Sequence, residues 1–290
     1  MAEKRADSGR LGNPEAMVRI LKPFAVYYVL NFITALIMTG LVKMISEEAG
    51  GSLAQFFGEQ EATVHAVIGG LAMVSGILPL LSDFRCEIYG EAGNRAGRHN
   101  RIFFTITLAI ASSLAVNFFF QLFHLTESSA AYEQTAERQY GVIFPIGILL
   151  YGFVSPFAEE VVFRGILYNR LKRLFGESTV YRKPLSAVLP IVLSGLLFGI
   201  YHGNPVQMLY GFLMGMLIAY VYERCGVFFY AVLFHAAANL AVYIITGIPA
   251  LYELFMTLPA GIVFAGAAVI ALRWFSTGAF GHGASDRRES

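Results

Sequence analysis

Long apolar stretches separated by short polar segments dominate the pattern along the chain. A helix that crosses a bilayer needs about 20 largely apolar residues, and eight stretches approach or exceed this length. They lie at about 17–44, 62–82, 102–125, 140–163, 185–202, 206–222, 227–247 and 250–273. The pattern predicts an all-α polytopic membrane protein with about eight transmembrane helices.

The two ends of the chain differ from these stretches. Residues 1–16 and 276–290 are polar and contain Gly and Ser, so we expect them to be tails outside the membrane. Residues 17–275 are then expected to form a single transmembrane domain.

Basic residues are concentrated in alternate connections between the apolar stretches. Of the 21 Lys and Arg residues, only Lys43 and Arg138 fall in the other set of connections. That set also carries seven glutamates: Glu47, Glu48, Glu59, Glu61, Glu127, Glu133 and Glu137. Because Lys and Arg are retained on the cytoplasmic side of a membrane, we expect an integral multi-pass protein with both termini in the cytoplasm.

The overall composition agrees with a membrane protein. The chain is 56% hydrophobic and 14% charged, whereas a soluble domain carries about 25% charged residues. A net charge of +1 gives no reason to expect a nucleic-acid partner. Cys86 and Cys225 are isolated, so neither a zinc ribbon nor a redox motif is predicted.

Two adjacent glutamates, Glu159 and Glu160, interrupt the fourth apolar stretch. A carboxylate inside a membrane is costly and is retained mainly where it is paired or functional. On a helix, Glu160 and Arg164 are four residues apart and share a face, which predicts an ion pair. Glu159 is turned by about 100° from Glu160 and is therefore a candidate for chemistry.

Three further polar residues lie in apolar stretches at informative positions. His202 ends the fifth stretch, and His235 and Asn239 are four residues apart in the seventh, with alanines between them. At about 1.5 Å per residue, Glu159 and His202 are both roughly 26 Å from the connection between their helices. We therefore expect these two side chains at the same depth on adjacent helices.

Glycines recur at every fourth position in the fifth and sixth stretches. They are Gly195, Gly199, Gly203, Gly211 and Gly215. Such spacing lets membrane helices approach closely, and it predicts a tight scaffold, either around a site or as ordinary helix packing.

The polar set limits the chemistry. No aspartate lies in an apolar stretch, no His-Glu-x-x-His occurs, and Ser194-Gly195 lacks the Gly-x-Ser-x-Gly context. Activation of water by a carboxylate remains, with histidine and asparagine as donors to an oxyanion. By ligand type, a zinc ion held by His202, His235 and Glu159 remains an alternative.

Three motifs in this order resemble the CAAX prenyl protease and bacteriocin-processing family. They are Glu159-Glu160-x-x-x-Arg164, Phe198-x-x-x-His202 and His235-x-x-x-Asn239. The resemblance covers about residues 140–245, which we expect to be the catalytic core. The best-known members, the type II CAAX prenyl endopeptidases, remove the last three residues of prenylated proteins.

The resemblance implies an eight-helix intramembrane endopeptidase. It implies that Glu159 and His202 activate water, that His235 and Asn239 stabilise the oxyanion, and that Glu160, Arg164 and Phe198 support the site. We favour a mechanism without a metal cofactor. The implied partners are a peptide or lipidated-protein substrate and membrane lipid.

A non-catalytic scaffold or a transporter is the alternative function. A transporter is expected to show repeated halves and broken helices, and neither is evident in the sequence. A scaffold derived from an enzyme is expected to have lost a motif residue, and all motif positions are intact here.

Overall fold

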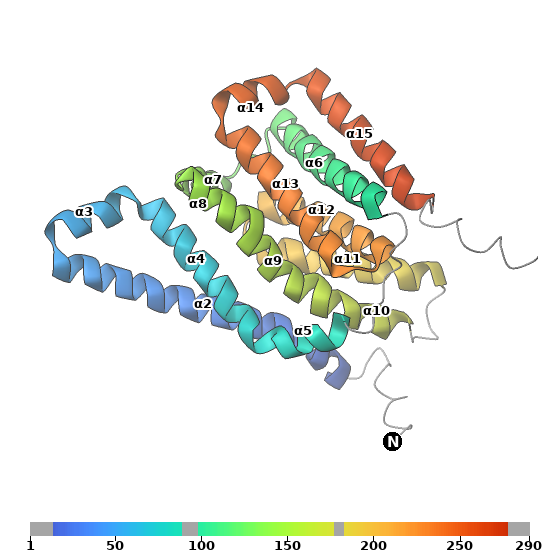
Figure 1. Ribbon diagram of the computed structural model, residues 1–290, viewed down its shortest axis with the longest axis horizontal. Helices are drawn as coiled ribbons and strands as arrows, with labels where there is room; N and C mark the ends of the chain where they lie inside the picture. Colours follow the sequence, from blue (N-terminus) through green and yellow to red (C-terminus); the bar gives the residue numbers. More distant parts are fainter. Residues whose placement is uncertain (1–13, 89–97, 177–182, 278–290) are drawn as a thin grey trace, which may run out of the picture.

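The computed structural model describes residues 14–88, 98–176 and 183–277, and within these residues the regular secondary structure is helical (Figure 1). This confirms the predicted all-α class. The predicted tails fall almost entirely outside the described residues. The first helix begins at Pro14, three residues before the predicted apolar stretch.

The helical segments follow one another with short connections. In chain order they are α2 (Pro14–Ala49), α3 (Gly51–Glu59), α4 (Glu61–Ile77), η1 (Leu78–Leu80), α5 (Leu81–Ile88), α6 (Arg98–Leu122), α7 (Ala130–Tyr140), α8 (Phe144–Leu149), η2 (Leu150–Val154), α9 (Ser155–Glu160), η3 (Val161–Tyr168), α10 (Asn169–Gly176), α11 (Lys183–Tyr201), α12 (Pro205–Cys225), α13 (Phe228–Gly247), α14 (Pro249–Phe255) and α15 (Leu258–Ser276).

Seven helical segments are long and apolar enough to cross a membrane. They are Pro14–Glu48, Glu61–Ile88, Asn100–Leu122, Phe144–Gly176, Pro205–Cys225, Phe228–Gly247 and Leu258–Ser276. The fifth predicted stretch is a shorter apolar helix over Ser186–Tyr201. The protein is thus an integral multi-pass membrane protein.

Two predicted boundaries need correction. The fourth span begins at Phe144 rather than 140, because Tyr140 belongs to the separate helix α7. The last stretch is divided into α14 and α15, because Met256 leaves the helical conformation with φ −90° and ψ 52° and a proline lies in the first turn of α15.

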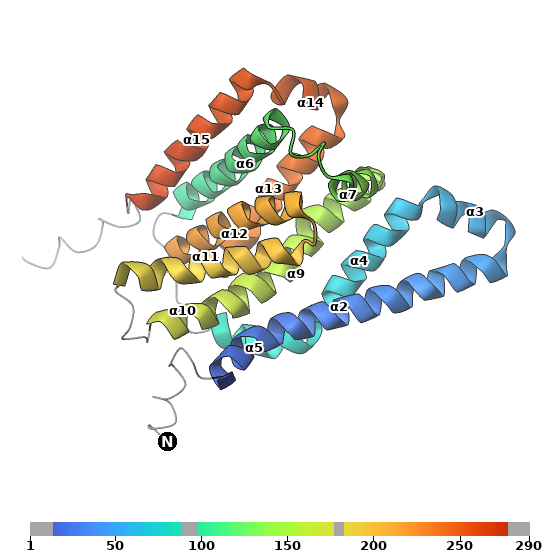
Figure 2. The ribbon, with the colours of Figure 1, turned by 180° about the vertical axis from the view of Figure 1, so that it is seen from behind.

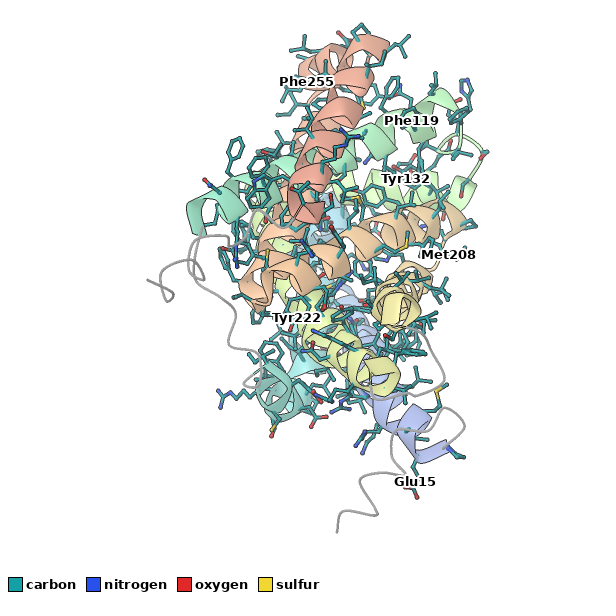
Figure 3. All side chains as sticks on the ribbon, turned by 90° about the vertical axis from the view of Figure 1, so that its right-hand side faces the viewer. Glu15, Phe119, Tyr132, Met208, Tyr222 and Phe255 are labelled. Atoms are coloured by element: carbon teal, nitrogen blue, oxygen red, sulfur yellow. The ribbon has the colours of Figure 1, made fainter. Side chains whose placement is uncertain are left out.

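The helices pack as an arm and a body. α2 packs against α4 to form the arm, α11 packs against α12, and α6 packs against α13 and α15. The rod formed by α8–α10 runs between them (Figures 1 and 2). Side chains, with Tyr222 among the buried ones, fill the spaces between helices (Figure 3).

The bundle has two distinct ends. The start of α2, α5, α10 and the last turn of α15 gather at one end, which we call the terminal end, while α3, α7 and α14 gather at the opposite, far end (Figure 1). The described basic residues lie mainly at the terminal end: Arg19, Lys22, Arg85, Arg170, Lys172, Arg173, Arg224 and Arg273. The structure therefore places the charges as the sequence pattern predicts, and the cytoplasmic location of the termini stays a prediction.

The glycine spacing produces the close approach of α11 and α12. A Cβ added to Gly199 would lie 2.4 Å from the carbonyl oxygen of Met208, and one on Gly195 would lie 2.9 Å from the amide nitrogen of Met216. Gly203 differs from the packing glycines, because it occupies the turn after α11 with φ +78°, where a side chain would be strained.

Candidate active site

The two glutamates lie in the middle of the α8–α10 rod, between two π-helical segments, η2 and η3. Pro156 has no N–H to donate to the carbonyl of Gly152, so the regular α-helical hydrogen-bond pattern is interrupted there. At the end of η2 the amide of Ser155 bonds to the carbonyl of Leu150, five residues earlier. Such π-helical turns are frequent at functional sites because they change the direction of neighbouring side chains.

Glu160 is the centre of a fully buried polar cluster. Its Oε1 accepts from Arg164 Nη1 at 2.9 Å and from His235 Nδ1 at 2.8 Å. Arg164 Nη2 donates to the carbonyl of Gly215 at 2.9 Å, and the guanidinium lies 4.6 Å from the ring centre of Phe198. The ion pair expected from sequence forms, and it also joins α13 and α12 to the rod.

Glu159 points in another direction, as the helical geometry predicts. Ser155 Oγ donates to its Oε1 at 2.8 Å, while its Oε2 lies 3.7 Å from His235 Nε2. Only 3% of Glu159 is exposed. Even so, it contributes to the wall of a cavity that is large enough to hold water molecules.

His202 occupies the turn that follows α11 and is held in one ring orientation. Its Nδ1 is 2.8 Å from the carbonyl oxygen of Phe198. A carbonyl only accepts, so Nδ1 carries the hydrogen and Nε2 of the neutral ring is an acceptor. Phe163, one turn after Glu159, contacts both Phe198 and Tyr201, with ring centres 5.0 and 5.6 Å away. Glu159 and His202 therefore lie at similar depth on neighbouring helices.

Asn239 lies on α13, one turn after His235. Its Nδ2 donates one hydrogen to the carbonyl of Tyr151 at 3.1 Å. The amide group has two hydrogens on Nδ2, so this bond fixes its orientation and leaves a second donor. Asn239 contributes to the wall of the same cavity as Glu159 and His202.

The cavity has a volume of about 590 Å³ and lies between the arm and the body. Its walls come from α2, α4, the end of α6, α7, the η2–α9 part of the rod, the end of α11 with the turn after it, the start of α12, and α13. Three of the four predicted catalytic residues line it: Glu159, His202 and Asn239. His235 lies behind Glu159, 5% exposed and bonded to Glu160.

The residues do not form a ready metal site. Within the described part of the chain, no three His, Cys, Asp or Glu side chains are close enough together to hold a metal ion. Glu160 Oε1 is already shared by Arg164 and His235. The suggested zinc set of Glu159, His202 and His235 therefore does not fit this arrangement, and no step of the mechanism below passes through a metal.

Three contacts of the site were not expected from the sequence. Ser155 binds Glu159, and the carbonyl of Tyr151 orients Asn239. Ser155 could have been found, because it precedes Glu159 by four residues and so shares its helix face. The carbonyl of Tyr151 has no sequence signal, because it comes from an interruption of the helix. The link between His235 and Glu160 was also missed, since these residues are far apart in sequence.

Comparison with known proteins agrees with the motif-based resemblance. Residues 141–241 match the family model described as Type II CAAX prenyl endopeptidase Rce1-like. The match contains all the predicted site residues and confirms the predicted family relationship over this segment. No curated protein and no solved structure gives a significant match to the chain.

Proposed function

We propose that this chain, whose residues 141–241 match the model of the type II CAAX prenyl endopeptidases, is an intramembrane endopeptidase that uses an activated water molecule. The observation that carries this proposal is that Glu159, His202 and Asn239 line one cavity. These residues supply a proton acceptor, a second acceptor and a hydrogen-bond donor around a single space. That is the minimum set for attack of water on a peptide carbonyl.

In the proposed mechanism, Glu159 is the general base. Its carboxylate and Nε2 of His202 orient the water, and Glu159 takes a proton from it as the water oxygen bonds to the carbonyl carbon. Glu159 then gives this proton to the leaving nitrogen as the carbon–nitrogen bond breaks. Ser155 holds the carboxylate in place during both transfers.

Asn239 and His235 stabilise the oxyanion in this proposal. Asn239 donates its second Nδ2 hydrogen, and its orientation is set by the carbonyl of Tyr151. His235 is positioned by its bond to Glu160, and in its doubly protonated form it donates from Nε2. Donors held in place before the reaction stabilise the charge that develops in the transition state.

Hydrolysis by the purified protein tests the function. The full chain in detergent is incubated with a library of peptides, and cleavage sites are identified by mass spectrometry. Cleavage of internal peptide bonds supports the endopeptidase. A transporter or a non-catalytic scaffold is expected to bind or move ligands without cleaving any member of the library, and that result would reject the proposal.

Asn239→Ala is expected to lower kcat by about 10²–10³, the loss seen when one oxyanion donor is removed. KM for a cleaved peptide is expected to change little, because the donor acts mainly in the transition state. The measurement is steady-state hydrolysis by purified variants. Asn31→Ala is a matched control, since Asn31 lines the same cavity on α2 and has no role in the mechanism. Equal losses in the two variants would contradict the oxyanion role of Asn239.

Zinc content is expected to be far below one equivalent per chain in fully active protein, because the described acidic and histidine side chains do not converge as ligands. Elemental analysis of purified protein, with activity measured on the same sample, checks this. Stoichiometric zinc that is lost together with activity in His202→Ala or His235→Ala would overturn the metal-free mechanism while leaving the peptidase assignment intact.

A further inference from the structure

The cavity extends from the active site in one direction only. Toward the far end its lining includes Tyr132, Thr135 and Gln139 of α7 and Gln207 near the start of α12. On the rod, the lining residue closest to the terminal end is Glu159 itself. The described residues of α5 and α10, which form the terminal end, contribute nothing to the lining. The glutamate therefore lies at the floor of a cavity that rises toward the far end.

Below Glu159 the structure is closed by tight packing. Every residue of η3, from Val161 to Tyr168, is buried. Tyr27 of α2 hydrogen-bonds to Tyr201 of α11 at 3.3 Å, and Phe24 of α2 packs on Phe163 of the rod with ring centres 5.6 Å apart. The side of the active site that faces the terminal end is thus filled by side chains.

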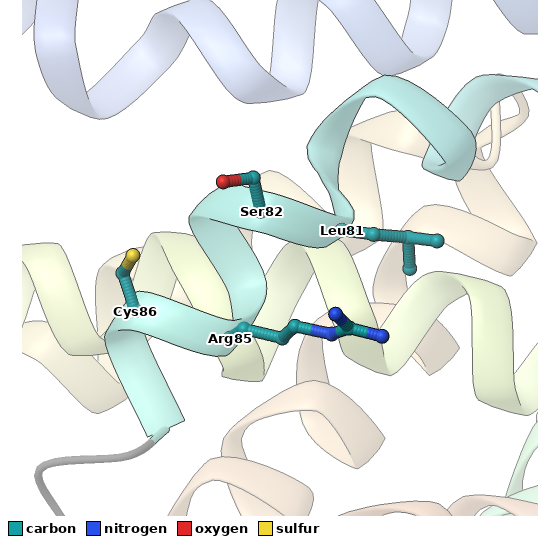
Figure 4. Close-up of a pocket in the computed structure, with 4 residues that line it drawn as sticks. All are labelled: Leu81, Ser82, Arg85 and Cys86. Carbon is teal, nitrogen blue, oxygen red and sulfur yellow. The ribbon is translucent and has the colours of Figure 1, made fainter.

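Ionic contacts hold this closed end together. Arg170 of α10 donates to Asp83 at 2.7 Å, to Glu87 at 2.9 Å and to the carbonyl of Arg19 at 2.6 Å. These bonds tie α5 and α2 to α10. Another hollow, of about 600 Å³ on α5 and lined by Leu81, Ser82, Arg85 and Cys86 (Figure 4), contains none of the active-site residues.

The cavity wall combines apolar residues with polar ones and contains no Lys or Arg among the described residues. Glu159 is its only Asp, Glu, Lys or Arg side chain among the described residues, and six of the lining residues are tyrosines. Amide side chains, including Asn117, Gln139 and Gln207, add to the polar part. Phenol and amide groups can hydrogen-bond a peptide backbone. A free C-terminal carboxylate would find no Lys or Arg partner in this wall and would face Glu159.

The charge distribution indicates which side of the membrane the cavity faces. The basic residues lie mainly at the terminal end, and such residues face the cytoplasm. We propose that the active site is entered from the non-cytoplasmic face, through the far end of the bundle, and takes uncharged internal segments of polypeptides exposed on that face. This inference rests on the proposed function and names the substrate class of the same site.

Sidedness of cleavage tests the proposal. A quenched-fluorescent peptide that is cleaved in detergent, made membrane-impermeant by a large polar label, is added to sealed right-side-out or inverted vesicles containing the full chain. Two cysteines report orientation through an impermeant maleimide. Native Cys86 is exposed on α5 at the terminal end, and Gln134→Cys in a Cys86→Ser background places a thiol at an exposed position of α7.

We expect cleavage in right-side-out vesicles, where the thiol at position 134 is labelled, and none above leakage in inverted vesicles, where Cys86 is labelled. Detergent should restore cleavage in the inverted sample. Cleavage in sealed inverted vesicles would overturn the proposal and leave the peptidase function standing. Absence of cleavage by the detergent-solubilised protein would reject the peptidase function and this inference with it.

The nature of the segment is tested with two versions of the same peptide. One ends in a free carboxylate three residues after the cleaved bond, and the other continues beyond that point and ends in a carboxamide. The uncharged, longer version is expected to have the higher kcat/KM. A preference for the free carboxylate would overturn the inference that internal segments are the substrates.

Discussion

Glu159→Gln is expected to lower the rate of peptide hydrolysis by about 10²–10⁴, the usual contribution of a positioned general base. The amide nearly matches the carboxylate in shape, but it does not accept the proton of the attacking water. Glutamine can still accept the hydrogen bond from Ser155, which in the wild type is 2.8 Å long. The fold and peptide binding are therefore expected to survive, and kcat rather than KM should change.

Steady-state kinetics and thermal unfolding of the purified variant in detergent check this expectation. Glu133→Gln on α7 is the matched control, because Glu133 is exposed and makes no contribution to the proposed mechanism. The control should retain wild-type activity. Wild-type turnover by Glu159→Gln with an intact fold would refute the assignment of Glu159 as the base.

Arg164→Ala is expected to destabilise the protein by about 3–5 kcal/mol, because it leaves Glu160 as an unpaired charge in the interior. Both side chains are fully buried, with no exposed side-chain surface. The change also removes the donor to the carbonyl of Gly215. Activity should fall as well, since Glu160 holds His235 and would lose its own anchor.

Arg164→Lys should recover only part of this loss. Arg164 reaches Glu160 with Nη1 and Gly215 with Nη2, whereas lysine offers one compact charge on a flexible chain. Unfolding in detergent, followed by temperature or denaturant, measures both variants. Arg138→Ala on the exposed side of α7 is the control and should be nearly neutral. Wild-type stability and activity of Arg164→Ala would show that the ion pair contributes nothing to the site.

The features that the sequence determined by itself are local ones. Apolar stretches about as long as a bilayer is thick predict the membrane-spanning helices. An irregular segment would leave backbone N–H and C=O groups without hydrogen bonds in lipid, which costs too much free energy. The pair formed by Glu160 and Arg164 follows from a spacing of four residues on one helix. The different direction of Glu159 follows from the same geometry. These statements need no knowledge of how the helices meet.

Boundaries were predicted less well where two helices follow each other in one apolar stretch. The division between α14 and α15 was missed, because the residues around Met256 are as apolar as their neighbours. Hydrophobicity reports where a chain can be buried, and it does not report where its backbone turns. Tyr140 was assigned to the fourth apolar stretch, whereas it is the last residue of the separate helix α7. Tyr140 and the residues after it are similarly apolar, so hydrophobicity did not reveal this boundary.

Only the tertiary structure decided how the site is assembled. His235 and Glu160 are 75 positions apart, yet they form a 2.8 Å hydrogen bond, and the carbonyl that receives Arg164 belongs to Gly215 on another helix. The cavity, with a described wall that has no Lys or Arg, and its closed floor likewise come from several helices. Contacts of this kind depend on which helices pack together and at what depth. Helical periodicity determines the face that a residue occupies, whereas the packing of the helices determines what that face meets.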